Sequence, residues 1–152
     1  MIFGMLRQLL ITMRPKQWTK NVFIFAPLLF DLKLLDPYYI TRTVAAAFLF
    51  CILSGSVYLI NDLTDAEKDR QHPTKRSRPL ASGKLKRNWA LAAAVLLPPL
   101  SLTLSLLLDP WFALIGLVYF AIQLAYSLGL KNVVIVDVLI IASGFVLRVA
   151  AG

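Results

Sequence analysis

Long apolar runs separated by short polar links make up most of the chain. No charged residue occurs from Asn88 to Leu108 or from Pro110 to Leu130, and each of these runs is 21 residues long. A third uncharged run extends from Thr43 to Asn61. A helix of about 20 apolar residues crosses the hydrocarbon core of a bilayer. The pattern therefore predicts an all-α transmembrane fold.

We predict about five membrane-spanning helices preceded by a helix in the membrane interface. The first 13 residues place Ile2, Leu6 and Leu9 at helical spacing, which favours an interfacial helix over residues 1–13. A charged segment between the second and third spans is predicted to be a cytoplasmic loop over residues 61–87. The five spans are expected at about 18–35, 38–60, 89–108, 111–128 and 133–152.

Composition and charge agree with a membrane protein. Hydrophobic residues make up 59% of the chain and the mean hydropathy is +0.72, whereas apolar residues form about 45–50% of ordinary soluble domains. The net charge is +8, but the bases cluster beside the spans, as the positive-inside rule describes. We therefore expect an integral protein of a bacterial-type plasma membrane, with a cytoplasmic N-terminus and loop 61–87 and no nucleic-acid partner.

Acidic side chains are spaced regularly at the end of the second span. Asp62, Asp65 and Asp69 have the spacing i, i+3, i+7, and Asn61 precedes them. If the second span continues as a helix, these side chains share one face. Like charges so close repel each other, and Mg²⁺, which prefers oxygen ligands and bridges carboxylates to phosphates, would offset that repulsion. We predict Asn61, Asp62, Asp65 and Asp69 as metal ligands, and the three aspartates as catalytic residues.

A simpler interpretation of the same acids is a solvated helix end. In that case Lys68 would pair with Asp65, and Arg70 would pair with Glu67. This alternative accounts for the balance of charge, but it does not account for the shared face at a membrane boundary.

Bases follow the acids immediately. Arginine binds phosphate oxygens through two parallel hydrogen bonds, and lysine supplies a point charge. A diphosphate at this place would contact the metal held by the acids and also the side chains of the bases. The alternative is a positive-inside loop that touches anionic lipid. The predicted phosphate-binding bases of this run are Arg70, Lys75, Arg76 and Arg78.

Other polar residues lie in or near the later spans. Tyr126 and Lys131 flank a short link on the same side as the acids, and we predict that they contact substrate phosphate. Lys131 could equally serve only to set topology. Asp137 and Arg148 fall within the fifth apolar segment, where ionisable groups usually face a bundle interior. Both a functional and a structural role remain open for these two.

Several motifs together resemble the UbiA superfamily of membrane prenyltransferases. The first aspartate-rich motif of that family matches Asn61-Asp62-x-x-Asp65-x-x-x-Asp69, and Tyr126 with Lys131 resembles its tyrosine–lysine element. The superfamily match continues into Arg70 and then Arg78-Pro79-Leu80-Ala81-Ser82-Gly83. Two other stretches look most like the decaprenyl-phosphate phosphoribosyltransferase branch. They are Arg14-Pro15-Lys16-Gln17-Trp18-Thr19-Lys20-Asn21 and His72-Pro73-Thr74-Lys75-Arg76.

The resemblance implies a bundle of about nine transmembrane helices around a central cavity. Two aspartate-rich motifs would face each other at the cytoplasmic mouth and bind Mg²⁺ with a diphosphate. In the phosphoribosyl branch, 5-phosphoribose passes from phosphoribosyl pyrophosphate to a polyprenyl phosphate. In other members, a polyprenyl diphosphate alkylates an aromatic acceptor, and this is the first alternative.

The second aspartate-rich motif has no counterpart in the sequence, which ends at Gly152. We therefore expect the chain to be the N-terminal half of such a bundle, with a C-terminal half as a partner. A second alternative follows, in which this chain is an inactive fragment or a partner subunit that only binds lipid or other helices.

Overall fold

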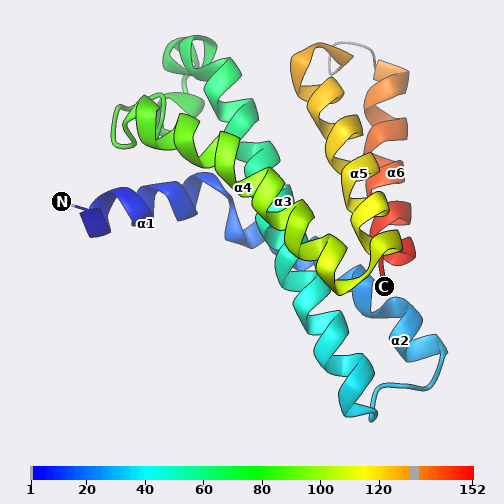
Figure 1. The fold of residues 1–152 in the computed structure, drawn as a ribbon. Helices are drawn as coiled ribbons and strands as arrows, with labels where there is room; N and C mark the ends of the chain where they lie inside the picture. The colour runs from blue at the N-terminus through cyan, green and yellow to red at the C-terminus, as the bar shows by residue number, and fades with distance from the viewer. Residues whose placement is uncertain (1, 131–133) are drawn as a thin grey trace.

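The computed structural model describes residues 2–130 and 134–152, and its regular structure there is helical (Figure 1). This confirms the predicted all-α class. In chain order the elements are α1 (Ile2–Thr12), the 3-10 helix η1 (Pro15–Phe25), α2 (Ala26–Phe30), α3 (Pro37–Gln71), the 3-10 turn η2 (Lys75–Ser77), α4 (Arg87–Leu108), α5 (Pro110–Leu128) and α6 (Val134–Ala150).

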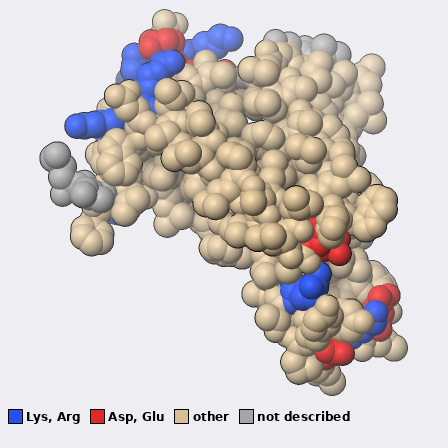
Figure 2. Space-filling model, viewed as in Figure 1, with Lys and Arg blue, Asp and Glu red and all other residues tan. Residues whose placement is uncertain are grey.

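Three of these helices, α3, α4 and α5, are long and apolar enough to cross a membrane. Apolar side chains cover much of the outer surface of α4 and α5, including Leu96, Leu107 and Leu117. Figure 2 shows charged side chains gathered towards two ends of the molecule with an uncharged zone between them. This distribution fits an integral membrane protein. The fifth predicted span corresponds to α6, which has 17 residues.

The first predicted span, 18–35, is not one α-helix in the structure. The chain forms η1 and then the five-residue helix α2. Arg14, which precedes η1, has the left-handed φ of 55°, and Pro15 begins η1 directly after it. At the other end Leu32 also has a positive φ, 56°, so the chain turns back before α3. The turn at Leu32 falls within the predicted span, whereas the turn at Arg14 precedes it.

The charged segment 61–87 is a loop only in its second part. Helix α3 continues through Gln71, so the aspartates are helical, and the loop begins at His72. Pro73 follows, and a proline so soon after a helix end prevents its continuation. The loop packs back onto α3 and α4 through a small buried cluster of Leu59, Leu80, Leu85 and Ala90.

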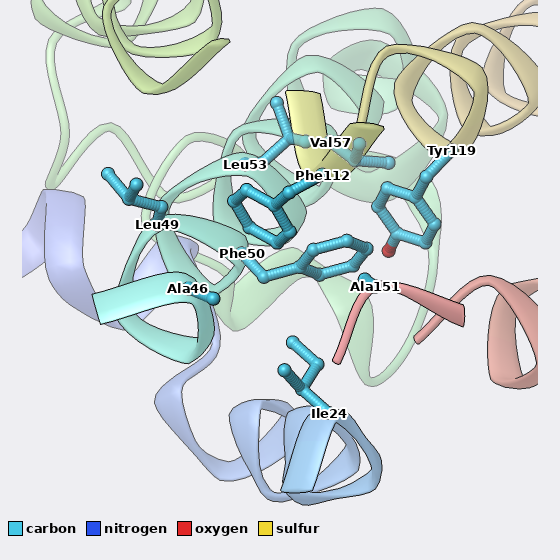
Figure 3. Close-up of a cluster of buried hydrophobic side chains, with 9 residues drawn as sticks. All are labelled: Ile24, Ala46, Leu49, Phe50, Leu53, Val57, Phe112, Tyr119 and Ala151. Atoms are coloured by element: carbon cyan, nitrogen blue, oxygen red, sulfur yellow. The ribbon is translucent and has the colours of Figure 1, made fainter. Parts of the chain in front are cut away.

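The main core lies where η1, α3, α5 and the end of α6 meet. Phe50 is 1% exposed, and its ring centroid lies 4.7 Å from that of Tyr119. Ser101 of α4 donates a hydrogen bond to the Leu49 carbonyl at 2.8 Å, which joins α4 to α3. Figure 3 shows the residues of this core: Ile24, Ala46, Leu49, Phe50, Leu53, Val57, Phe112, Tyr119 and Ala151.

The helices are arranged as two pairs. In Figure 1, α3 with α4 and α5 with α6 lie close together near the C-terminus and diverge toward the end that carries the 72–86 loop. The aspartates of α3 lie at this diverging end. The fold therefore places the charged segment beside the space between the two pairs.

Candidate active site at the end of helix α3

Two aspartates on the last turns of α3 are buried although they carry charge. Asp62 is 2% exposed and Asp69 is 3% exposed. They are seven residues apart, which is about two helical turns, so their side chains extend from the same face. The predicted shared face is present for this pair. Asp65, between them in sequence, is half-buried.

Arginines from two other segments contact these aspartates. Arg78, from the loop, places Nη1 2.7 Å from Asp69 Oδ2 and 3.3 Å from Asp62 Oδ1. Arg14, which precedes η1, places Nη2 2.7 Å from the same Asp62 oxygen. One guanidinium thus bridges the two carboxylates and a second one binds Asp62. Buried carboxylates are stable only with such partners.

Local structure explains how both arginines reach α3. The residues after Arg78, Pro79 and Leu80, are buried, and the Leu85 N–H donates to the Pro79 carbonyl at 2.9 Å. The loop is therefore fixed against the helix at the position that follows Arg78. Arg14 has a left-handed backbone conformation. Its guanidinium carbon packs over the ring of Tyr58, 4.8 Å from the ring centroid.

The chemistry of the site suits Mg²⁺, although the geometry does not show a finished metal site. The Asn61 amide oxygen is buried without a hydrogen-bond partner. Asn61 directly precedes Asp62 on α3, and amide and carboxylate oxygens are the kind of ligand that Mg²⁺ prefers. Within residues 2–130 and 134–152, however, no group of three or more acidic, histidine or cysteine side chains is placed to hold a metal. Arg78 lies between the two buried carboxylates instead.

The predicted phosphate-binding bases are distributed over three locations. Arg78 lies on the aspartates, whereas Arg70 pairs with Glu67 at 2.8 Å on the exposed side of α3. This ion pair is the one that the solvated-helix alternative predicts. Lys75 and Arg76 are exposed on η2.

The tyrosine–lysine element is described only in part. Tyr126, on α5, lies close enough to Asp137, on α6, for the two side chains to interact. Tyr126 also lines a cavity of about 160 Å³ between η1, α3, α5 and α6. Lys131, the predicted partner of Tyr126, lies outside the described residues.

Sequence reasoning did not assign two arginines to the site. Arg14 opens one of the stretches that carry the family resemblance, but its contact with Asp62, 48 residues away in sequence, was not predicted. The sequence leaves Arg148 open between a functional and a structural role, and the structure places it inside the bundle, where it is 6% exposed. Its intramembrane position was the one available signal, since buried ionisable groups are rare without a role.

Comparisons with known proteins agree with the geometry. A model of the UbiA prenyltransferase family matches residues 23–152. The chain is 42% identical over 148 residues to a decaprenyl-phosphate phosphoribosyltransferase of Mycolicibacterium smegmatis, covering 95% of this chain and 46% of that protein. It is 45% identical over 157 residues to the protein of the same name from Corynebacterium glutamicum, covering 98% and 45%.

A more distant relative has a different name. A nodulation protein of Azorhizobium caulinodans is 29% identical over 140 residues, covering 91% of this chain and 45% of that protein. The chain therefore spans about half the length of these curated relatives.

Proposed function

Since the chain belongs to the UbiA prenyltransferase family, we propose that it contributes to a membrane transferase whose leaving group is a Mg²⁺-bound pyrophosphate. The reaction we infer is transfer of 5-phosphoribose from phosphoribosyl pyrophosphate to a polyprenyl phosphate. A phosphate oxygen of the lipid would bond to the ribose carbon that carries the pyrophosphate. The carbon–oxygen bond to pyrophosphate would break, and its electron pair would leave with the pyrophosphate.

The observation that carries this proposal is the convergence of Asp62 and Asp69 at the end of a membrane helix. The two carboxylates are buried, they share one face, and Arg78 touches both. A solvated helix end would leave such groups exposed. Buried acids and bases in one place support a site for a ligand that carries negative charge and a metal.

Asn61, Asp62, Asp65 and Asp69 would hold the metal. Mg²⁺ bound there would neutralise the pyrophosphate and so stabilise it as a leaving group. The carboxylates fix the place at which the pyrophosphate binds. The buried amide oxygen of Asn61, which has no hydrogen-bond partner, would add a neutral ligand.

The bases would bind the donor phosphates. Arg78 can turn from the aspartates to phosphate oxygens, because its side chain is 25% exposed. The exposed Lys75 and Arg76 attract an anionic donor to the mouth. Tyr126 and Lys131 would complete the opposite wall, and the lipid would enter between the helices.

The choice of donor rests on the relatives, because either donor would expel pyrophosphate. The two relatives described above, 42% and 45% identical to the chain, are phosphoribosyltransferases by name, which favours phosphoribosyl pyrophosphate. The alternative is prenyl transfer from a polyprenyl diphosphate to an aromatic acceptor, which the name of the family itself favours. Both reactions would use a polyprenyl lipid at the same site, as the phosphate acceptor in the first and as the diphosphate donor in the second.

The test is transfer of label into lipid by the protein in lipid nanodiscs with Mg²⁺. Phosphoribosyl pyrophosphate labelled in the ribose is supplied with farnesyl phosphate, and labelled farnesyl diphosphate is supplied separately with 4-hydroxybenzoate. We expect solvent-extractable product from the first mixture alone. Product from the second mixture alone would overturn the choice of donor.

Variants of the aspartates test the site itself. Asp62→Asn and Asp69→Asn should each reduce Mg²⁺-dependent binding of pyrophosphate at least tenfold. The matched control is Asp31→Asn, an exposed carboxylate near the opposite end of the bundle. Unchanged pyrophosphate binding in both site variants would instead support a chain that has no catalytic site of its own.

A further inference from the structure

We propose a second anion site below the aspartates, in the cavity of about 160 Å³ between η1, α3, α5 and α6. In this site Arg148 and Lys20 bind a substrate phosphate other than the leaving pyrophosphate. The inference rests on the proposed function, which requires two further phosphates. One is the phosphate of the lipid acceptor and the other is the 5-phosphate of the donor.

Arg148 is buried and held by neutral groups. Its Nε donates to the Asn21 side-chain oxygen at 2.8 Å, Nη1 donates to the Gly144 carbonyl at 2.6 Å, and Nη2 lies 3.1 Å from the Tyr119 hydroxyl. The guanidinium carbon also lies 5.0 Å from the centroid of the Tyr119 ring. These contacts fix the position of the guanidinium, and they leave one N–H on each terminal nitrogen for another acceptor.

The positive charge of Arg148 has no carboxylate beside it. None of the ion pairs between described residues includes Arg148. The acidic residue on the same helix, Asp137, is eleven positions earlier, which is about 16 Å along the axis. A buried charge without a counter-charge is strongly unfavourable in a membrane bundle. An anion in the adjoining cavity would supply the missing negative charge.

The lining of the cavity suits a phosphate group. Lys20 brings a second positive charge to the cavity, and the described residues that line it include no acid. Hydroxyl and amide groups add hydrogen-bond donors for phosphate oxygens. The uncharged polar residues in the lining are Ser54, Tyr58, Tyr119, Gln123 and Tyr126.

The cavity adjoins the aspartates through Tyr58. This residue lies four positions before Asp62 on α3, which is about 6 Å along the helix. Arg14 lies over the Tyr58 ring and binds Asp62 at 2.7 Å. On α3 the lining extends back to Ser54, about two turns before Asp62. A phosphate in the cavity and a pyrophosphate at the aspartates would therefore lie about one to two turns apart along α3, where they can belong to one reaction.

The test measures binding without the metal, so that it does not depend on the aspartates. Farnesyl phosphate and ribose 5-phosphate are each titrated by calorimetry into the protein in nanodiscs with EDTA, and farnesol serves as the uncharged control. The variants are Arg148→Gln, Arg148→Lys and Lys20→Gln. The matched control is Lys33→Gln, which removes an exposed lysine near the other end.

We expect at least one of the two phosphates to bind, with an affinity at least tenfold lower in Arg148→Gln and about threefold lower in Lys20→Gln. Arg148→Lys should retain part of the affinity, and Lys33→Gln all of it. A loss confined to farnesyl phosphate assigns the site to the lipid, and a loss confined to ribose 5-phosphate assigns it to the donor.

Wild-type affinity for both phosphates in Arg148→Gln and Lys20→Gln would overturn the inference, as would the absence of phosphate binding to the wild type. Lys20 forms no hydrogen bond that holds the described fold together, so its variant is informative even if Arg148→Gln unfolds. Failure of the proposed function is seen separately, as unaltered Mg²⁺-dependent pyrophosphate binding in the aspartate variants.

Discussion

Arg78 Nη1 and Asp69 Oδ2 lie 2.7 Å apart, although Asp69 is on helix α3 and Arg78 is in the loop that follows it. The loop folds back so that its arginine neutralises the buried acids of the helix. The same guanidinium is a suitable ligand for a phosphate. The acidic and basic motifs therefore form one unit, and removal of either part should affect the other.

Replacement of Arg78 should destabilise the protein. Arg78→Gln leaves Asp69 buried without its cation, and loss of one partner of a fully buried pair costs about 3–5 kcal/mol. Arg78 is 25% exposed, so we expect a smaller loss, about 2 kcal/mol, seen as a lower midpoint of thermal unfolding in detergent. Adding Asp69→Asn to Arg78→Gln should restore part of it. An unchanged midpoint in Arg78→Gln would show that the ion pair contributes nothing.

Mg²⁺ should stabilise Arg78→Gln more than the wild type. A ligand that binds only the folded state raises the free energy of unfolding, and the increase grows with the ratio of ligand concentration to dissociation constant. In the wild type Arg78 contacts Asp62 and Asp69, two carboxylates that the metal would use. In the variant these carboxylates no longer have the Arg78 guanidinium as a partner. The measurement is the unfolding midpoint over a Mg²⁺ titration. Equal shifts in the two proteins would argue against a metal at these carboxylates.

A methyl group at Gly55 should disturb the packing of the N-terminal segment on α3. A Cβ there would lie 2.7 Å from Met13 Cε and 3.1 Å from Met13 Cβ. Overpacking of this kind costs about 1–3 kcal/mol. Gly55→Ala should lower the unfolding midpoint, and Met13→Ala added to it should recover part of the loss. The control is Gly4→Ala, because nothing lies within 4 Å of a Cβ at that position.

The topology can be tested with single cysteines in a Cys51→Ala background. We expect Arg76→Cys, on the exposed turn η2, to react with a membrane-impermeant maleimide only from the cytoplasmic side. Lys33→Cys, near the opposite end, should react only from outside. The readout is labelling in intact cells compared with inverted vesicles. Labelling of both positions from the same side would contradict the predicted orientation.

The part of the site that depends on helical spacing was predictable from the sequence. Asp62 and Asp69 lie two turns apart because the backbone is helical, and that follows from their positions in the chain. Asp62 is also bound by Arg14, which is 48 residues away in sequence. No local pattern indicates such a contact. The spacing also did not reveal that Arg78 would lie between the carboxylates.

The segment of residues 18–35 shows the limit of hydropathy. Its apolar residues suggest a membrane helix, yet the structure has η1 and then the short helix α2. Hydropathy indicates whether a segment can lie in lipid, but it does not indicate where the backbone turns. Within this segment the positive φ angle of Leu32 marks the turn that redirects the backbone before α3.

The sequence by itself determined the class of the fold, the membrane environment and the acidic face of α3, because each depends on the spacing of residues close together in the chain. Only the tertiary structure decided which cations meet those acids and that Arg148 is enclosed rather than turned outward. Those outcomes depend on packing between segments far apart in sequence, where burial makes an unpaired charge costly. Asn21 and Arg148, 127 residues apart and hydrogen-bonded at 2.8 Å, illustrate this dependence.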